Sequence, residues 1–202
     1  MGDGRTRGAV LVTGFGAFLD VVDNPSGWLA ERVHGAQIPG GPEVYGLRLP
    51  VSYGRAPSQT LAAIGALRPR LVIGLGVATG RTEVCVEALG RRSPLSDQPD
   101  VDGVVLSDLE EGGPASVQAT APVELLARAL GAVVSEDAGG YVCNAWLYRV
   151  LRGLQRTPAA PLPAVVFVHM PTPGLPPELL LSGISSTWSA LSTAESQTPI
   201  ST

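Results

Sequence analysis

Cys143 is the residue whose surroundings most invite a chemical interpretation, because glycines precede it and a helix-like segment follows it. A thiol at a helix N-terminus lies at the positive end of the helix dipole, beside free backbone N–H groups. Those groups favour the thiolate and can hold an oxyanion. A free cysteine is, however, more often a small buried hydrophobe. That structural interpretation fits Cys85, which alternates with valines and which we assign to the core.

The sequence holds two histidines, and they differ in setting. His34 closes a helix-like segment, where its side chain suits the negative end of the dipole and needs no catalytic explanation. His169 instead ends the apolar run 165–168. An imidazole at the end of a buried strand needs a partner, and ligand sites gather at the carboxyl ends of parallel strands. At this point His169 is either a site residue or a hydrogen-bonded structural one.

Glu87 is the candidate partner for that histidine. Strand alternation over residues 83–87 places Glu83, Cys85 and Glu87 on one face and the two intervening valines on the other. A carboxylate on a partly buried face is costly unless it is paired. We therefore expect Glu87 and an imidazole to lie together.

Two glycine-rich turns, at residues 13–18 and 74–80, raise the question of a nucleotide site. The glycine spacing at 74–80 does not match the dinucleotide fingerprint, and no acidic residue ends a following strand at the usual distance. A P-loop lysine with its serine or threonine is also missing from the sequence. Phosphate binding is therefore not expected.

Short apolar runs alternate along the chain with amphipathic segments, a pattern typical of an α/β fold with a mostly parallel sheet. The expected strands are 9–13, 44–50, 71–76, 84–87, 132–135 and 164–169. The expected helices are 25–34, 56–67, 122–130, 144–154 and 177–191. The strands are nearly continuous in Val, Leu and Ile, as in strands buried on both faces. Residues 91–114 have no clear period and predict a long functional loop.

Length and composition predict one domain. The chain has 202 residues, of which 45% are hydrophobic and 16% charged, with a net charge of −4. A single core at residues 9–192 is expected, with a flexible segment at 1–8 and a frayed tail at 193–202. No basic run points to nucleic acid or to an anionic membrane. Two cysteines build no disulfide framework, and the apolar run at 9–12 is too short for a signal peptide or a membrane span, so a cytoplasmic protein is expected.

Taken together, these segments resemble the pyroglutamyl peptidase I family, also called pyrrolidone carboxyl peptidases. The resemblance runs in order through Leu-Val-Thr-Gly-Phe at 11–15 with Phe18, Asn-Pro-Ser at 24–26, Leu-Pro-Val-Ser-Tyr at 49–53, Gly-Arg at 80–81 with Val-Glu at 86–87, Glu-Gly-Gly-Pro-Ala at 111–115, Ala-Gly at 138–139 with Val-Cys-Asn at 142–144, and Phe-Val-His-Met-Pro at 167–171. Each piece is short, but seven in this order and spacing are highly specific.

The resemblance implies a Cys-His-Glu triad, carried here by Cys143, His169 and Glu87. It also implies a single-domain, three-layer α/β/α protein that is cytoplasmic, uses no metal or cofactor, acts on peptides with an N-terminal pyroglutamate, and often forms dimers or tetramers. The low surface charge agrees with an apolar face covered by a second subunit. The residues that the resemblance assigns to substrate binding are Phe15, Phe18, Asn24, Val51, Val77, Tyr141 and Val142, with the Val77 backbone and Asn24 at the ring amide.

Three segments depart from the family pattern. Leu19 and Asp20 replace two glycines after the first aromatic residues, residues 88–92 replace the usual sequence after Glu87, and residues 172–176 differ beyond Pro171. The loop after Glu87 is also shorter, so the sequence does not identify which arginine, if any, serves the site. Substrate preference and efficiency depend on these loops.

Two other functions stay open at this point. A non-enzymatic relative would keep the fold and bind a peptide N-terminus or a partner protein, although a purely structural role would not require all three triad residues. A different acyl-cysteine hydrolase, acting on another lactam or capped amine, would share the chemistry and differ in the pocket.

Overall fold

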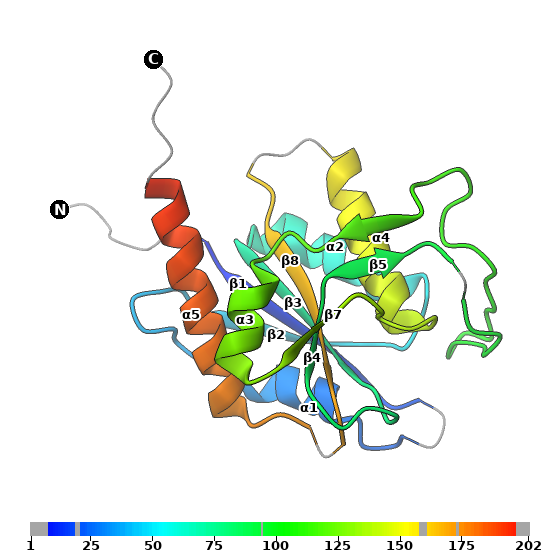
Figure 1. The fold of residues 1–202 in the computed structure, drawn as a ribbon, viewed down its shortest axis with the longest axis horizontal. Coiled ribbons are helices and arrows are strands. Elements are labelled where there is room, and N and C mark those ends of the chain that lie inside the picture. The colour runs from blue at the N-terminus through cyan, green and yellow to red at the C-terminus, as the bar shows by residue number, and fades with distance from the viewer. Residues whose placement is uncertain (1–7, 19–20, 94, 158–160, 173, 197–202) are drawn as a thin grey trace.

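The computed structural model describes residues 8–18, 21–93, 95–157, 161–172 and 174–196. Its elements, in chain order, are β1 (Val10–Phe15), α1 (Pro25–Arg32), β2 (Val44–Leu49), α2 (Arg55–Leu67), β3 (Leu71–Val77), β4 (Cys85–Glu87), β5 (Leu89–Arg91), β6 (Ser116–Gln118), α3 (Val123–Leu130), β7 (Val133–Ser135), α4 (Val142–Arg156), β8 (Ala164–Met170) and α5 (Pro177–Ser196). Six strands form one sheet in the order β2-β1-β3-β8-β4-β7. Helices cover both faces (Figure 1), which confirms the expected α/β fold with a three-layer arrangement.

The centre of the sheet is built from the most apolar strands. Every residue of β1 and β8 is buried, and so are six of the seven residues of β3. β2, β1, β3 and β8 run parallel to one another, as the continuous Val, Leu and Ile runs predict. Burial on both faces, which those runs also predict, is wrong for the two edge strands: β7 exposes Val133 and Val134, and β2 exposes Arg48.

Alternation along the strands divides the core into two halves. Val10 and Val12 of β1 pack with α1, α3 and α5, while Leu11 and Phe15 pack with α2 and α4. Figure 1 shows α3 and α5 side by side on one flank of the sheet and α4 on the other. Side chains of β8 divide in the same way, so Phe167 lies on the α4 face.

β4 reverses the direction of the sheet. It pairs antiparallel with β8 and parallel with β7, so the last two strands oppose the four parallel ones. In this register Cys85 lies opposite His169 and Glu87 lies opposite Phe167. Val86 belongs to the core half packed by α3, which leaves Cys85 and Glu87 on the α4 face, as the sequence alternation predicts.

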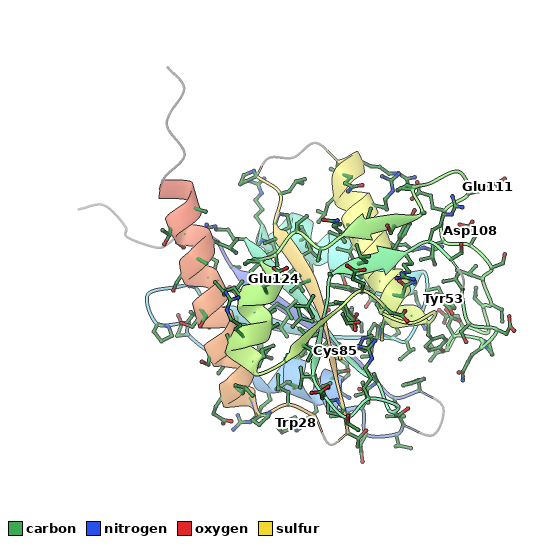
Figure 2. The ribbon with its side chains drawn as sticks, in the orientation of Figure 1. Trp28, Tyr53, Cys85, Asp108, Glu111 and Glu124 are labelled. Carbon is green, nitrogen blue, oxygen red and sulfur yellow. The ribbon has the colours of Figure 1, made fainter. Side chains whose placement is uncertain are left out.

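The long loop predicted at 91–114 is present and is anchored at two points. The buried Asp100 carboxylate accepts backbone N–H bonds from Tyr53 at 2.8 Å, Asp102 at 2.8 Å and Val104 at 2.9 Å. Glu110 accepts two bonds from the Arg152 guanidinium, which holds the pKa of that carboxyl at about 2. Asp108 and Glu111 lie at the outer edge of the molecule in Figure 2, away from the sheet.

Several element boundaries differ from the sequence-based expectations. β5 and β6 form a short two-stranded antiparallel sheet that no apolar period marks. α4 begins at Val142, one residue before Cys143. α5 continues to Ser196, so its last four residues lie within the segment 193–202 that the sequence predicts as a frayed tail. Residues 1–7 and 197–202 lie outside the described residues.

α1 approaches the sheet so closely that its neighbours in β1 and β2 must be glycines. A Cβ added at Gly46 would lie 1.8 Å from the carbonyl oxygen of Ala30. We expect Gly46→Ala to lower the free energy of unfolding by about 1–3 kcal/mol, because the backbone of α1 has to move away from β2. Urea denaturation followed by circular dichroism measures this change.

The matched control is Gly65→Ala in α2, where an added Cβ would meet no heavy atom within 4 Å. This substitution should stabilise the protein by about 0.5–1 kcal/mol through helix propensity alone. Equal urea midpoints for the two variants would contradict the close packing of α1 on the sheet.

Candidate active site

A small cavity of about 120 Å³ lies where β1 and β3 end. Its lining residues are Phe15, Phe18, Asn24, Val51, Val77, Ala138, Gly139, Gly140, Tyr141, Cys143 and His169. Six of the seven residues predicted to bind substrate are in this set. The seventh, Val142, is buried in the core half packed by α4 and does not line the cavity.

His169 and Glu87 form a buried hydrogen-bonded pair. The ring Nδ1 of His169 lies 2.7 Å from Oε1 of Glu87, and the two residues are 4% and 0% exposed. Both side chains project to the α4 face, from the neighbouring antiparallel strands β4 and β8. Their positions are diagonal across the strand pair, a separation that long side chains can span. The predicted Glu–His partnership is therefore present, and it directs the other ring nitrogen, Nε2, away from Glu87.

Cys143 lies in the first turn of α4 and shares the cavity wall with His169. Tyr141 caps the helix in an extended conformation without a side-chain hydrogen bond to the first turn. The backbone N–H groups of residues 142–144 therefore lack the intrahelical acceptors that later residues have. No hydrogen bond joins Sγ of Cys143 to the His169 ring among the described contacts. The site thus presents a thiol, an imidazole and a set of free N–H donors around one cavity.

Gly76 makes room for the sulfur atom. A Cβ added at this position would lie 2.8 Å from Sγ of Cys143. Gly76 also pairs with His169 in the β3–β8 register. The glycine in β3 therefore lets the thiol lie against the sheet next to the histidine strand, an arrangement that the glycine-rich run at 74–80 did not reveal.

The electrostatics of Cys143 differ from the sequence-based expectation. Burial raises the pKa of the Cys143 thiol to about 12, and the negative charge of Glu87 adds to this effect. A backbone hydrogen bond and the positive charge of Arg81 act in the opposite direction but are smaller. The predicted preference for the thiolate at the helix N-terminus is therefore outweighed by desolvation, and the neutral thiol is the favoured form.

Arg81 is the residue at this site that the sequence analysis did not identify. Its Nη1 donates to Oε1 of Glu87 at 2.7 Å, and its Nη2 donates to the backbone oxygen of Asp137. Burial would lower the pKa of Arg81, but the neighbouring Cys85 side chain and Glu87 carboxylate raise it overall, so the guanidinium is permanently charged. The only sequence signal was the Gly-Arg pair at 80–81.

The two arginines that follow β4 are engaged elsewhere. Backbone N–H and C=O groups of Arg91 bond to the buried Asn144 side chain at 2.7 and 2.8 Å, which ties β5 to the first turns of α4. Arg92 donates to the carbonyl oxygen of Gly113 and pairs with Asp108 in the long loop. The shorter loop after Glu87 thus leaves both side chains out of the cavity lining.

Asn24 is part of the cavity wall, but most of its side chain is used to build α1. Its Oδ1 accepts from Ser26 N at 3.1 Å and from Ser26 Oγ at 2.7 Å, as an N-cap residue does. Its Nδ2 donates to the Gly16 carbonyl oxygen at 3.0 Å. One amide hydrogen is left for a ligand. Asn24 therefore also fixes the turn between Phe15 and Phe18.

Aromatic rings form the rest of the wall. The Phe18 and Tyr141 ring centroids lie 5.9 Å apart, and Tyr53 packs edge-on against Tyr141 at 5.6 Å. The Tyr141 hydroxyl donates to the Pro99 carbonyl oxygen at 2.9 Å, which attaches the long loop to the cavity. Leu19 and Asp20, which depart from the family pattern, lie outside the described residues.

Two further features of the described chain bear on function. No three His, Cys, Asp or Glu side chains of the described residues gather into an arrangement that could hold a metal ion. None of the helices in that same part of the chain combines the length and hydropathy that crossing a bilayer demands.

Comparison with known proteins places the chain among peptidases. Over 169 residues it is 36% identical to the pyrrolidone-carboxylate peptidase of Klebsiella pneumoniae (strain 342), covering 80% of this chain and 77% of the relative. It is 35% identical to the enzyme of the same name from Halalkalibacterium halodurans, covering 80% and 83% of the two chains. The solved structure of the pyrrolidone carboxyl peptidase from Thermococcus litoralis superposes with a TM-score of 0.83 at 26% identity, covering 96% of this chain and 100% of that one.

The family match spans the whole sheet and every residue of the cavity wall. A sequence model of the pyroglutamyl peptidase family covers residues 8–187, from the residues before β1 to the middle of α5. Together with the shared fold and the two relatives above, this match shows that the chain belongs to the pyroglutamyl peptidase family of peptidases.

Proposed function

We propose that this chain is a cysteine exopeptidase that hydrolyses the bond after an N-terminal pyroglutamyl residue of a peptide. The observation that carries the proposal is the shared cavity wall of Cys143 and His169, with the imidazole tethered to the buried Glu87 at 2.7 Å. A nucleophile, a base and a group that orients the base are the parts that acyl transfer requires. Family membership supplies the substrate class.

The acylation step uses the thiol and the imidazole together. Sγ of Cys143 attacks the carbonyl carbon that joins pyroglutamate to the next residue, while the thiol proton passes to Nε2 of His169. Because burial favours the neutral thiol, proton transfer accompanies attack rather than preceding it. The free N–H groups of the first turn of α4 receive the oxyanion. The C–N bond then breaks as Nε2 returns the proton to the departing amine, which leaves a thioester on Cys143.

Water completes the cycle. It attacks the thioester carbonyl carbon and gives one proton to Nε2 of His169. The C–S bond breaks, the proton passes to the sulfur, and pyroglutamate leaves with the thiol restored. In both steps Glu87 holds Nδ1 of the ring, so it fixes the tautomer and stabilises the imidazolium that forms.

The cavity suits an uncharged lactam. Of the described residues that line it, none is acidic, and most are apolar or aromatic. The β1–β3 register ends at Gly14 and Leu75, so the Val77 backbone has no β1 partner and is available to the ring amide. The remaining amide hydrogen of Asn24 offers a second polar contact. An ordinary N-terminus carries a charged amine, for which this lining provides no partner.

We also propose that the enzyme works in the cytoplasm as a homo-oligomer, either a dimer or a tetramer. Two free cysteines agree with a reducing compartment. Exposed apolar side chains at Trp28 of α1 and at Val133 and Val134 of β7 offer surface for a second subunit. Light scattering on a sizing column measures the oligomeric state.

Substitution of the nucleophile and the base tests the proposed peptidase function. Wild-type protein under reducing conditions should release a fluorescent amine from a pyroglutamyl amide, whereas Cys143→Ser and His169→Ala should lose at least about 1,000-fold in kcat. Glu87→Gln should keep a larger residual rate, because the imidazole remains but loses its oriented tautomer.

The matched control is His34→Gln, which removes the other histidine and should keep the wild-type rate. Its Nδ1 accepts a bond from the Gly46 N–H on the α1 side of the sheet, outside the cavity lining. Prolyl and glutamyl amides should be cleaved far more slowly than the pyroglutamyl amide. Preferred cleavage of a different lactam amide would contradict the assigned substrate.

Alkylation tests the protonation state of Cys143. Because the pKa of this thiol is raised to about 12, its thiolate fraction should rise roughly tenfold per pH unit through the neutral and mildly alkaline range. We therefore expect the rate of alkylation by iodoacetamide to keep increasing from pH 6 to pH 10. Mass spectrometry of the labelled Cys143 peptide measures this rate.

Cys143→Ser supplies the background for that experiment, since the remaining Cys85 is 6% exposed. A rate that levels off below pH 8 would contradict the neutral thiol and indicate a preformed thiolate–imidazolium pair.

A further inference from the structure

The Arg81 guanidinium joins two parts of the site that the sequence keeps far apart. One of its nitrogen atoms donates to Glu87 at 2.7 Å, and the other donates to the Asp137 backbone oxygen. Glu87 belongs to the acid–imidazole pair, and Asp137 begins the segment that leads from β7 into α4. The side chain is 26% exposed, so it reaches the pair from the surface of the protein.

The segment that Arg81 holds is the pocket wall. Residues 138–141, which directly follow Asp137, all line the cavity, and Cys143 comes two residues later. Asp137 organises this turn with its own side chain, since its Oδ1 accepts the Gly139 N–H at 3.0 Å. Gly139 has a φ of +76°, a conformation that glycine adopts without strain. The position of the Asp137 carbonyl therefore influences both the wall and the entry into α4.

The carboxylate that Arg81 contacts, that of Glu87, has few other hydrogen-bond partners. Glu87 is fully buried, and its Oε1 accepts from both His169 and Arg81, while Oε2 has no hydrogen-bond partner among the described residues. A buried carboxylate needs a paired cation to remain ionised and oriented. Arg81 is the one permanent cation that contacts it in the described part of the chain.

We propose that Arg81 is a positioning residue with two separable effects: it pairs with Glu87 and keeps that carboxylate aimed at His169, and it holds the Asp137–Tyr141 wall of the substrate pocket. The proposal rests on the peptidase function proposed above. Only the planar guanidinium supplies both effects together, because its two nitrogens donate in different directions at once. A lysine ammonium in the same place supplies the charge from a single point.

The test compares Arg81→Ala and Arg81→Lys in steady-state kinetics with a pyroglutamyl amide. Arg81→Ala should lower kcat by roughly 10- to 100-fold, because the imidazole loses its fixed orientation, and should also raise KM. Arg81→Lys should keep kcat within about threefold of wild type, while its KM stays raised as in Arg81→Ala, because the lysine restores the charge but not the wall contact. Millimolar guanidinium should restore part of the kcat of Arg81→Ala, since the vacated site opens to solvent.

Arg156→Ala is the matched control. It also removes an arginine that pairs with a carboxylate, Glu110, but it lies 13 residues beyond Cys143 on α4, about 20 Å away. It should leave kcat and KM unchanged and show no response to guanidinium. Thermal unfolding of all variants separates loss of fold from loss of positioning.

A readout that needs no substrate keeps the proposal separate from the peptidase function. The Nδ1 proton that His169 shares with Glu87 should give a far-downfield proton resonance in wild type and Arg81→Lys, and this resonance should disappear in Arg81→Ala. Failure of wild-type protein to cleave the amide would overturn the function but leave the resonance as the test of positioning. The role of Arg81 would be overturned if Arg81→Ala matched Arg156→Ala in its kinetics and its resonance. Equal losses of kcat in Arg81→Ala and Arg81→Lys would also overturn it.

Discussion

The buried charge of Glu87 is the constraint on which the rest of this structure depends. A carboxylate with no exposed surface is strongly disfavoured unless hydrogen bonds and a counter-charge offset the loss of water. His169 and Arg81 supply both, and they do so through the same oxygen atom. The reversed direction of β4 makes this possible, because it sets Glu87 one pleat away from His169 on the same face of the sheet. The antiparallel edge of an otherwise parallel sheet thus serves the site.

The central strands also allow α4 to pack closely against the sheet. Gly74 and Gly76 of β3 leave space that Trp146, Phe167 and Cys143 occupy. Close packing of this kind surrounds the sheet side of the thiol with protein atoms, and desolvation outweighs the helix N-terminus in setting the pKa of Cys143. A low local dielectric also strengthens any hydrogen bond from the first turn of α4 to an oxyanion. Burial therefore disfavours the charged nucleophile and favours the charged intermediate.

Features that depend on local periodicity could be predicted from the sequence. Features that depend on which distant residues come into contact could not. Alternation alone placed Glu87 and Cys85 on one face, and the apolar run before His169 placed that residue at the end of a buried strand. β5 and β6 were missed because three residues carry no period, and the exposure of β7 was missed because apolar composition does not distinguish an edge strand from a central one. Arg81 was missed because a long flexible side chain reveals its partners only in three dimensions.

The arrangement of charges around Cys143 has a consequence for when the nucleophile becomes active. Glu87 is hydrogen-bonded to His169 and disfavours a thiolate at Cys143, while Arg81 acts on the thiol in the opposite sense. An isolated thiolate–imidazolium pair gains little in this setting, since the carboxylate that stabilises one partner repels the other. A substrate carbonyl changes the balance, because the negative charge then moves from the sulfur to an oxygen near the N–H groups of α4. The site is therefore organised around the charge distribution of the tetrahedral intermediate rather than that of a resting ion pair.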